Sequence, residues 1–280
     1  MNNQEALYSA SKILNVKISK SPFLDAEILL SHILKVGREE LLLSLNTIIN
    51  KKDYRKFIEL ALRRQKGEPI AYIVGFKEFW KYKYIVNPDV LIPRPDTEVI
   101  VEEALKLIPE DASFKILDIG TGSGCIIISI LKERKKCFGV GIDISKKALK
   151  VAKINAKMQQ IKNRIKFVNS DIDKFYFGKY DIILSNPPYI NSFGINYLDR
   201  DIKNYEPKVA LDGGIDGLSC INTVIKRSSK LLKKKGKLIF EIDSNQLGKT
   251  RKLLNKKDFF INKIAKDLEN NDRCLLLTRN

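Results

Sequence analysis

The stretch 185–189, which reads Ser-Asn-Pro-Pro-Tyr, holds the side chains best suited to chemistry. It follows the apolar run 180–184, which predicts a buried strand that stops abruptly, because prolines cannot continue a strand ladder. An asparagine amide offers a carbonyl and an NH2 group, and prolines keep their carbonyls while stiffening the turn. We expect Asn186 and Pro187 to accept hydrogens from a planar group that bears an NH2, with Tyr189 adding a flat aromatic face. A plain turn is the alternative for these residues taken alone.

The composition narrows the kind of protein. Of the 280 residues, 44% are hydrophobic and 30% are charged, as in a globular protein with room for one large and one small domain. The longest apolar run, 125–131, is far shorter than a membrane span, and the first residues lack the pattern of a signal peptide, so we expect a cytoplasmic protein. The four cysteines form no Cys-x-x-Cys pair, and His32, which we expect to pack within a helix, is the only histidine. We therefore expect neither a metal site nor a histidine base beside Asn186.

The net charge of +18 is compatible with two interpretations. A basic surface is typical of proteins that contact nucleic acid, and it would help on an RNA-rich partner. The alternative is drift in a lysine-rich composition, with the lysine runs 233–235 and 256–257 as solvated loop charges. We favour drift and expect no direct binding of nucleic acid.

The N-terminal part of the chain predicts a small helical domain. Apolar residues recur at i, i+3 and i+4 from about residue 4 to 66, which predicts four or five helices within 1–68, and we expect this domain to recognise a partner. The segment 69–92 is aromatic and rich in β formers, so it predicts a hairpin linker. Arg94 then stands between two prolines, in a fixed loop that either presents it to an acidic or polar group or braces the linker.

The remainder, 93–280, alternates strand, turn and helix, which predicts an α/β domain with a mostly parallel, doubly wound sheet. The expected strands are 115–119, 138–142, 165–168, 180–184 and 237–242, the expected helices begin at 125, 146 and 221, and an antiparallel hairpin of 259–265 and 273–278 ends the chain. Ligands bind at the carboxyl edge of such sheets, which is where the stretch 185–189 falls.

Polar residues at successive strand ends indicate a cofactor. The loop 120–124, Gly-Thr-Gly-Ser-Gly, lets the backbone approach a ligand closely, although a dinucleotide would fit such a loop too. Asp118 suits a cationic amino group better than a pyrophosphate, Asp143 lies where ribose hydroxyls would be, and Asp171 could read an adenine amine. This set favours S-adenosylmethionine. The expected cofactor-binding residues are Asp118, Gly120, Thr121, Gly122, Ser123, Gly124, Asp143, Asp171, Ile172 and Asn186.

On these residues the chain resembles class I S-adenosylmethionine-dependent methyltransferases and, more narrowly, the PrmC (HemK) family. The similarity covers nearly the whole chain, and the segment with most weight is Ile-Pro-Arg-Pro at 92–95. Other matching segments are 71–75, 78–79, 120–124, 186–190, 205–207, 210–211 and 214–218.

The resemblance implies a Rossmann-like, seven-stranded methyltransferase domain and a specific reaction. The family transfers a methyl group from S-adenosylmethionine to the side-chain amide nitrogen, N5, of the glutamine in the Gly-Gly-Gln motif of class I peptide-chain release factors, with S-adenosylhomocysteine as product. The implied catalytic residues are Asn186, Pro187 and Tyr189, and the implied substrate-binding residues are these three with Pro188 and Arg94. We expect release factors as partners and a monomer.

Other functions are compatible with the same residues. An Asn-Pro-Pro-Tyr clamp also serves amino groups of bases in DNA and rRNA methyltransferases, and related enzymes modify a glutamine of ribosomal protein L3. A DNA enzyme needs base flipping and a sizeable reading region, for which only the small helical domain is left. A binding module that kept the fold without catalysis is the non-enzymatic alternative.

Overall fold

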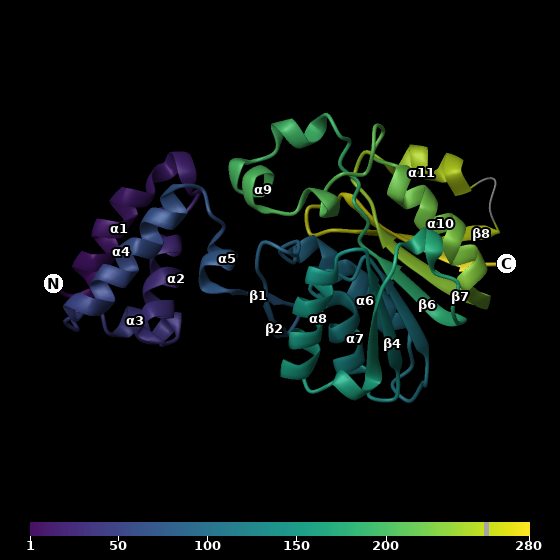
Figure 1. Cartoon of the computed structure of the whole chain (residues 1–280), viewed down its shortest axis with the longest axis horizontal. Helices are drawn as coiled ribbons and strands as arrows, with labels where there is room; N and C mark the ends of the chain where they lie inside the picture. The colour runs from purple at the N-terminus through teal and green to yellow at the C-terminus, as the bar shows by residue number, and fades with distance from the viewer. Residues whose placement is uncertain (255–257) are drawn as a thin grey trace. The chain divides into compact units, whose positions relative to one another are not determined.

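A computed structural model of the chain describes residues 1–254 and 258–280, and of residues 15–18 only the backbone (Figure 1). The lysine pair 256–257 therefore lies outside the described residues. The chain forms two compact units. The first consists of residues 1–76 and 199–205, and the second of residues 77–198 and 206–280.

The first unit is helical. Its elements are α1 (Asn3–Ile18), α2 (Pro22–Leu34), α3 (Arg38–Leu43), α4 (Lys51–Gln65), α5 (Ile70–Val74) and, from the distant segment, α9 (Arg200–Tyr205). Apolar residues at helical spacing form its core, among them Leu14, Leu30 and Phe57. The prediction that His32 packs within a helix is wrong, because its side chain is exposed on α2.

A two-stranded hairpin follows, as predicted, but it starts later than expected. It pairs β1 (Phe76–Phe79) with β2 (Tyr82–Ile85), while the preceding residues 70–74 form helix α5. Gly75 ends that helix with a φ of 81°, a left-handed conformation that glycine adopts without strain. A short apolar run cannot by itself distinguish a helix from a strand, which explains the difference.

The second unit is built on a seven-stranded sheet in the order β5-β4-β3-β6-β7-β9-β8, so the predicted fold class is confirmed. The strands are β3 (Lys115–Ile119), β4 (Phe138–Asp143), β5 (Ile165–Asn169), β6 (Tyr180–Ser185), β7 (Leu232–Glu241), β8 (Phe259–Lys266) and β9 (Asp272–Arg279). The first five run parallel in the sheet, and β9 pairs antiparallel with both β7 and β8.

Helices cover both faces of this sheet (Figure 1). They are α6 (Glu98–Leu107), α7 (Cys125–Glu133), α8 (Lys146–Met158), α10 (Ser219–Leu231) and α11 (Leu247–Leu254). Successive strand residues point to opposite faces, so Ile116 packs in the core with α6, α7 and α8, while Leu117 packs in the core with α10 and α11. The strands are therefore buried on both sides, as a parallel sheet requires.

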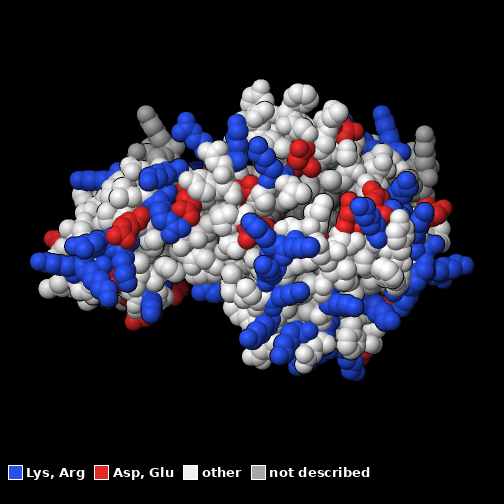
Figure 2. Space-filling model, viewed as in Figure 1, with Lys and Arg blue, Asp and Glu red and all other residues white. Residues whose placement is uncertain are grey.

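The lysine run 233–235 lies at the start of β7 and not in a loop. Residues 180 and 182 of β6 pair with residues 232 and 237 of β7, so the register shifts across the run and the three lysines bulge out, exposed. Figure 2 shows lysine and arginine side chains spread over the visible surface of both units, so the excess of basic residues is not confined to one patch on this face. Among the described helices, none is long and apolar enough to cross a membrane.

Candidate functional site

A cavity of about 380 Å³ opens at the carboxyl ends of β3, β4 and β6, entirely within the second unit. The structure brings most of the predicted site residues to its wall: Arg94, Gly120, Thr121, Gly122, Ser123, Asp143, Asp171, Ile172, Asn186, Pro187 and Pro188. Asp118, Gly124 and Tyr189 do not line it.

The glycine loop follows β3 and lines the cavity with residues 120–123. Gly120 and Gly122 have φ values of 70° and 54°, a left-handed backbone that other residues adopt only with strain. The backbone N–H groups of Gly120 and Thr121 both donate to the Ile142 carbonyl at 3.0 Å, which fastens the loop to β4. A side chain at Gly120 would meet no atom within 4 Å, so the space above this residue is open for a ligand.

Asp143 joins the loop to the second strand. Its Oδ2 accepts the Gly122 N–H at 2.9 Å, and its Oδ1 accepts the Ser145 N–H at 2.8 Å. Burial raises the pKa of this carboxyl, and the two N–H donors favour its charged form. Each carboxylate oxygen has a second lone pair, so Asp143 can still accept hydrogen bonds from hydroxyl groups of a ligand in the cavity.

Asp118 lies beneath the loop and is fully buried. Its Oδ2 accepts the Thr121 hydroxyl at 2.6 Å, while its Oδ1 has no partner among the described residues. Burial raises the pKa of Asp118 to about 7. An unpaired buried carboxylate oxygen is costly, and a cation above the loop would reduce that cost. Asp118 was predicted to contact the ligand, but it does not line the cavity. Its charge can still attract a cationic group of a ligand across the loop.

Of the residues predicted to bind adenine, Asp171 is more exposed than Asp118 or Asp143. Asp171 is exposed and precedes the 3₁₀ turn 172–174, where its Oδ1 accepts the Asp173 N–H at 2.9 Å. Ile172 is partly buried beside it, and both residues line the cavity. The carboxylate of Asp171 is free to accept an amine hydrogen with its second oxygen, and the Ile172 side chain offers an apolar surface.

Asn186 follows the end of β6 and lines the same cavity. The strand end is fixed by Ser185, whose hydroxyl donates to the Ile119 carbonyl at 2.9 Å. The Asn186 side-chain NH2 donates to the Thr97 hydroxyl oxygen at 3.0 Å. Pro187 and Pro188 follow along the same wall.

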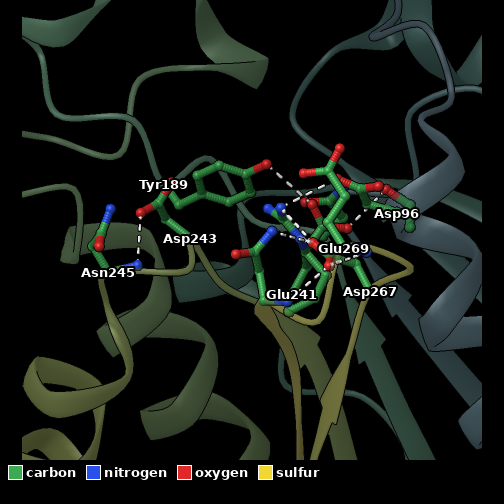
Figure 3. A network of polar contacts seen from close by, with 11 residues as sticks. Asp96, Tyr189, Glu241, Asp243, Asn245, Asp267 and Glu269 are labelled. Carbon is green, nitrogen blue, oxygen red and sulfur yellow. Dashed lines mark hydrogen bonds and ion pairs between the residues drawn. The ribbon is translucent and has the colours of Figure 1, made fainter.

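Tyr189 departs from the prediction. Its ring packs against the core to which α10 contributes. Its hydroxyl donates to Glu241 Oε1 at 3.1 Å (Figure 3). Burial and the neighbouring Glu241 carboxylate raise the pKa of this hydroxyl. The structure therefore gives no support to the predicted contact between this ring and a substrate in the cavity.

Arg94 lines the cavity but is already paired. Its guanidinium forms an ion pair with Glu206, whose side chain is buried, and Glu206 Oε2 also accepts the Ile92 N–H at 3.3 Å. The loop thus presents Arg94 to an acidic group of this chain, and the implied contact with the substrate stays a prediction.

Two residues of the site were missed by sequence reasoning, Thr97 and Glu241. Both are almost fully buried, and the Thr97 hydroxyl donates to Glu241 Oε2 at 2.7 Å. The one signal for Glu241 was its place at the end of the apolar run 238–240, a strand end like those of Asp143 and Asn186. Burial raises the pKa of Glu241 to about 7.

Comparison with known proteins gives two domain matches. The PrmC N-terminal domain matches residues 5–75, and a methyltransferase domain matches residues 110–277. A release factor glutamine methyltransferase of Fusobacterium nucleatum is 40% identical over 261 residues, covering 91% of this chain and 73% of that protein. A protein of the same description from Buchnera aphidicola is 40% identical over 254 residues, covering 91% of each chain.

Among solved structures, a ribosomal protein L11 methylase from Lactobacillus delbrueckii subsp. bulgaricus aligns with a TM-score of 0.51. It is 20% identical and the alignment covers 73% of this chain and 90% of that chain. At this identity the similarity shows a shared fold alone.

The seven-stranded sheet, the glycine loop at its edge and the matched domain define a methyltransferase. Within that class, the chain belongs to the release factor glutamine methyltransferase family, whose PrmC N-terminal domain it also contains. The family predicted from the sequence is thereby confirmed.

Proposed function

We propose that the protein transfers a methyl group from S-adenosylmethionine to the side-chain amide nitrogen, N5, of the glutamine in the Gly-Gly-Gln motif of class I peptide-chain release factors. The observation that carries this proposal is the position of Asn186, whose amide lies on the wall of the same cavity as the glycine loop and Asp143. Membership of the family supports the identity of the substrate.

The residues present fit the cofactor. The open space above Gly120, the unpaired buried oxygen of Asp118 and the remaining lone pairs of Asp143 suit a ligand with a cationic amino group and ribose hydroxyls. Asp171 and Ile172 would hold the adenine. When bound, S-adenosylmethionine supplies an electrophilic methyl group on a sulfonium.

Asn186 and Pro187 would hold the substrate. A glutamine amide nitrogen is a poor nucleophile, because its lone pair is delocalised into the carbonyl. The Asn186 side-chain oxygen and the Pro187 carbonyl would accept its two hydrogens, aim the nitrogen at the methyl group and stabilise the positive charge that develops on the nitrogen. Positioning and electrostatic stabilisation then supply the catalysis. The N–CH3 bond forms as the S–CH3 bond breaks, S-adenosylhomocysteine leaves, and the methylated amide loses its extra proton to water.

We place the reaction in the cytoplasm, with a monomer as the active species and without direct binding of nucleic acid. The helical domain within 1–68 would recognise the release factor, because it corresponds to the part matched by the PrmC N-terminal domain.

The test is methyl transfer to an intact release factor, followed by peptide mass spectrometry. We expect one added methyl group on the glutamine of the Gly-Gly-Gln motif, and none on a release factor in which that glutamine is changed to asparagine. Incorporation into ribosomal RNA or ribosomal protein L3, with none into the release factor, would contradict the proposed substrate and keep the reaction type.

A further inference from the structure

We infer that Thr97 and Glu241 are positioning residues that fix the amide of Asn186 with its oxygen toward the cavity. This inference rests on the proposed function, in which the Asn186 oxygen must accept a hydrogen of the substrate amide. An amide turned the other way would point its NH2 group at the NH2 group of the substrate. Catalysis therefore depends on which end of the Asn186 side chain faces the cavity.

The three residues form a chain of hydrogen bonds. The Asn186 NH2 group donates to Thr97 Oγ1 at 3.0 Å, and the Thr97 hydroxyl donates to Glu241 Oε2 at 2.7 Å. Tyr189 approaches Glu241 from the other side and donates to Oε1 at 3.1 Å. The chain thus runs from the cavity wall into the core (Figure 3 shows its inner end).

The direction of these bonds follows from the chemistry of the groups. An ionised carboxylate can only accept hydrogen bonds, so Thr97 must use its single hydrogen on Glu241. The Thr97 oxygen is then left as an acceptor, and only the NH2 end of the Asn186 amide can satisfy it. The amide oxygen must consequently face the cavity.

The environment of Glu241 makes this chain of hydrogen bonds sensitive to the protonation of Glu241. The side chain is 1% exposed, and its pKa is raised to about 7 by burial. Among the described residues, the charged and titratable groups that face it are Asp96, Tyr189, Arg273 and Cys274. Arg273 favours the ionised form, but it is shared with Asp96 at 3.2 Å and with Asp267 at 2.9 Å. Compensation of the Glu241 charge is therefore incomplete.

Protonation of Glu241 would reverse the direction of the hydrogen bonds in this chain. A neutral Glu241 carboxyl can donate its hydrogen to Thr97, which frees the Thr97 hydroxyl to donate to Asn186. The Asn186 oxygen would then turn toward Thr97, and its NH2 group would face the substrate. Methyl transfer should consequently fall as the pH decreases through the pKa of Glu241.

The first test compares Thr97→Val with Thr97→Ser. Valine keeps the shape of threonine and removes the hydroxyl, whereas serine keeps the hydroxyl. We expect Thr97→Val to lower kcat roughly tenfold, because the amide is no longer held in one orientation. Thr97→Ser should restore most of the rate, and the Kd for S-adenosylmethionine should be similar in both variants. Equal kcat values for the two variants would overturn the inference.

The second test is the pH profile of kcat between pH 6 and pH 8.5. With Glu241 ionising near pH 7, the natural protein should lose about tenfold at the acid end. Thr97→Val and Glu241→Gln should both flatten this acid limb, which a purely structural role of Thr97 would not do. Glu103→Gln is the matched control, because Glu103 is also buried in this unit but pairs with Lys106 and Lys263. An acid limb that persists in Thr97→Val would contradict the inference.

A third readout does not depend on activity. In a ¹⁵N-labelled sample, the side-chain NH2 signals of Asn186 are those missing from Asn186→Ala. We expect these signals to shift with a midpoint near pH 7 in the natural protein, and not in Thr97→Val or Glu241→Gln. The same titration in all three proteins would overturn the inference. The expected difference between the proteins, without any methylation of the release factor, would instead contradict the proposed function.

Discussion

The Gly122 N–H donates to Asp143 Oδ2 at 2.9 Å, so the loop that follows β3 is tied to the end of β4 through a side chain that itself lines the cavity. A second bond, from the Ser145 N–H to Asp143 Oδ1 at 2.8 Å, continues this connection toward the start of α8. Asp143 therefore shapes the loop and offers its remaining lone pairs to a ligand.

Changing Asp143 to alanine should weaken cofactor binding far more than it changes the chemical step. Two charge-assisted hydrogen bonds are lost together with the predicted contacts to ribose hydroxyls, so we expect the Kd for S-adenosylmethionine to rise about 30-fold or more. Isothermal titration calorimetry measures this directly. Asp111→Ala is the matched control, because Asp111 pairs with Lys136 at an exposed position. Equal Kd values for the two variants would contradict the role of Asp143.

The buried carboxyl of Asp118 should make the stability of the free protein depend on pH. Its pKa rises from 3.8 in the unfolded chain to about 7 in the folded protein, so the folded protein binds the proton more tightly. The stabilisation from this group is complete below pH 3.8 and is lost as the pH rises through about 7. Between pH 5 and pH 8 the loss should be about 3 kcal/mol.

Asp118→Asn should remove that part of the pH dependence. Urea unfolding at pH 5 and pH 8 gives the free energies of unfolding, and Glu241 titrates in both proteins, so the difference between them isolates Asp118. We expect the variant to be at least as stable as the natural protein at pH 8. An equal decrease in stability from pH 5 to pH 8 in both proteins would show that Asp118 is ionised normally.

The ion pair between Arg94 and Glu206 allows the bracing role to be tested. Arg94→Met leaves the buried Glu206 carboxylate without its guanidinium partner, which should lower the free energy of unfolding by about 2 kcal/mol. Replacing both residues, as Arg94→Met with Glu206→Met, should restore part of that loss, because no buried charge remains. If Arg94→Met is as stable as the natural protein but raises the KM for the release factor, Arg94 acts on the substrate instead.

Much of the fold follows from the local pattern of the sequence. Helix α8 (Lys146–Met158) begins at the predicted residue, because its apolar residues keep a helical period and Ser145 caps its first turn by accepting the Ala148 N–H at 3.1 Å. The parallel strands were predicted to within one or two residues, except the start of β7, because each is a short apolar run between turn signals. β7 begins five residues earlier than predicted, since its bulged lysine run does not resemble a strand.

The polar contacts of Thr97, which lines the cavity, and of Glu241, which does not, could not be predicted in this way. Thr97 and Glu241 are 144 residues apart in the sequence, and no period or motif connects them. The direction of the Tyr189 ring likewise depends on a carboxylate 52 residues away. Residue types at strand ends therefore indicate which side chains reach the sheet edge, but tertiary packing decides which of them face the cavity and which support those that do.

Removal of the Asn186 side chain tests whether it holds the substrate amide for methyl transfer. The single-turnover rate of methylation of an intact release factor would be measured by mass spectrometry for the natural protein and for Asn186→Ala, with Asn163→Ala, an exposed residue outside the cavity, as control. We expect Asn186→Ala to be slower by about 100-fold or more, with the Kd for S-adenosylmethionine nearly unchanged. An Asn186→Ala variant that keeps the natural rate, or that loses only cofactor binding, would show that Asn186 does not hold the substrate amide.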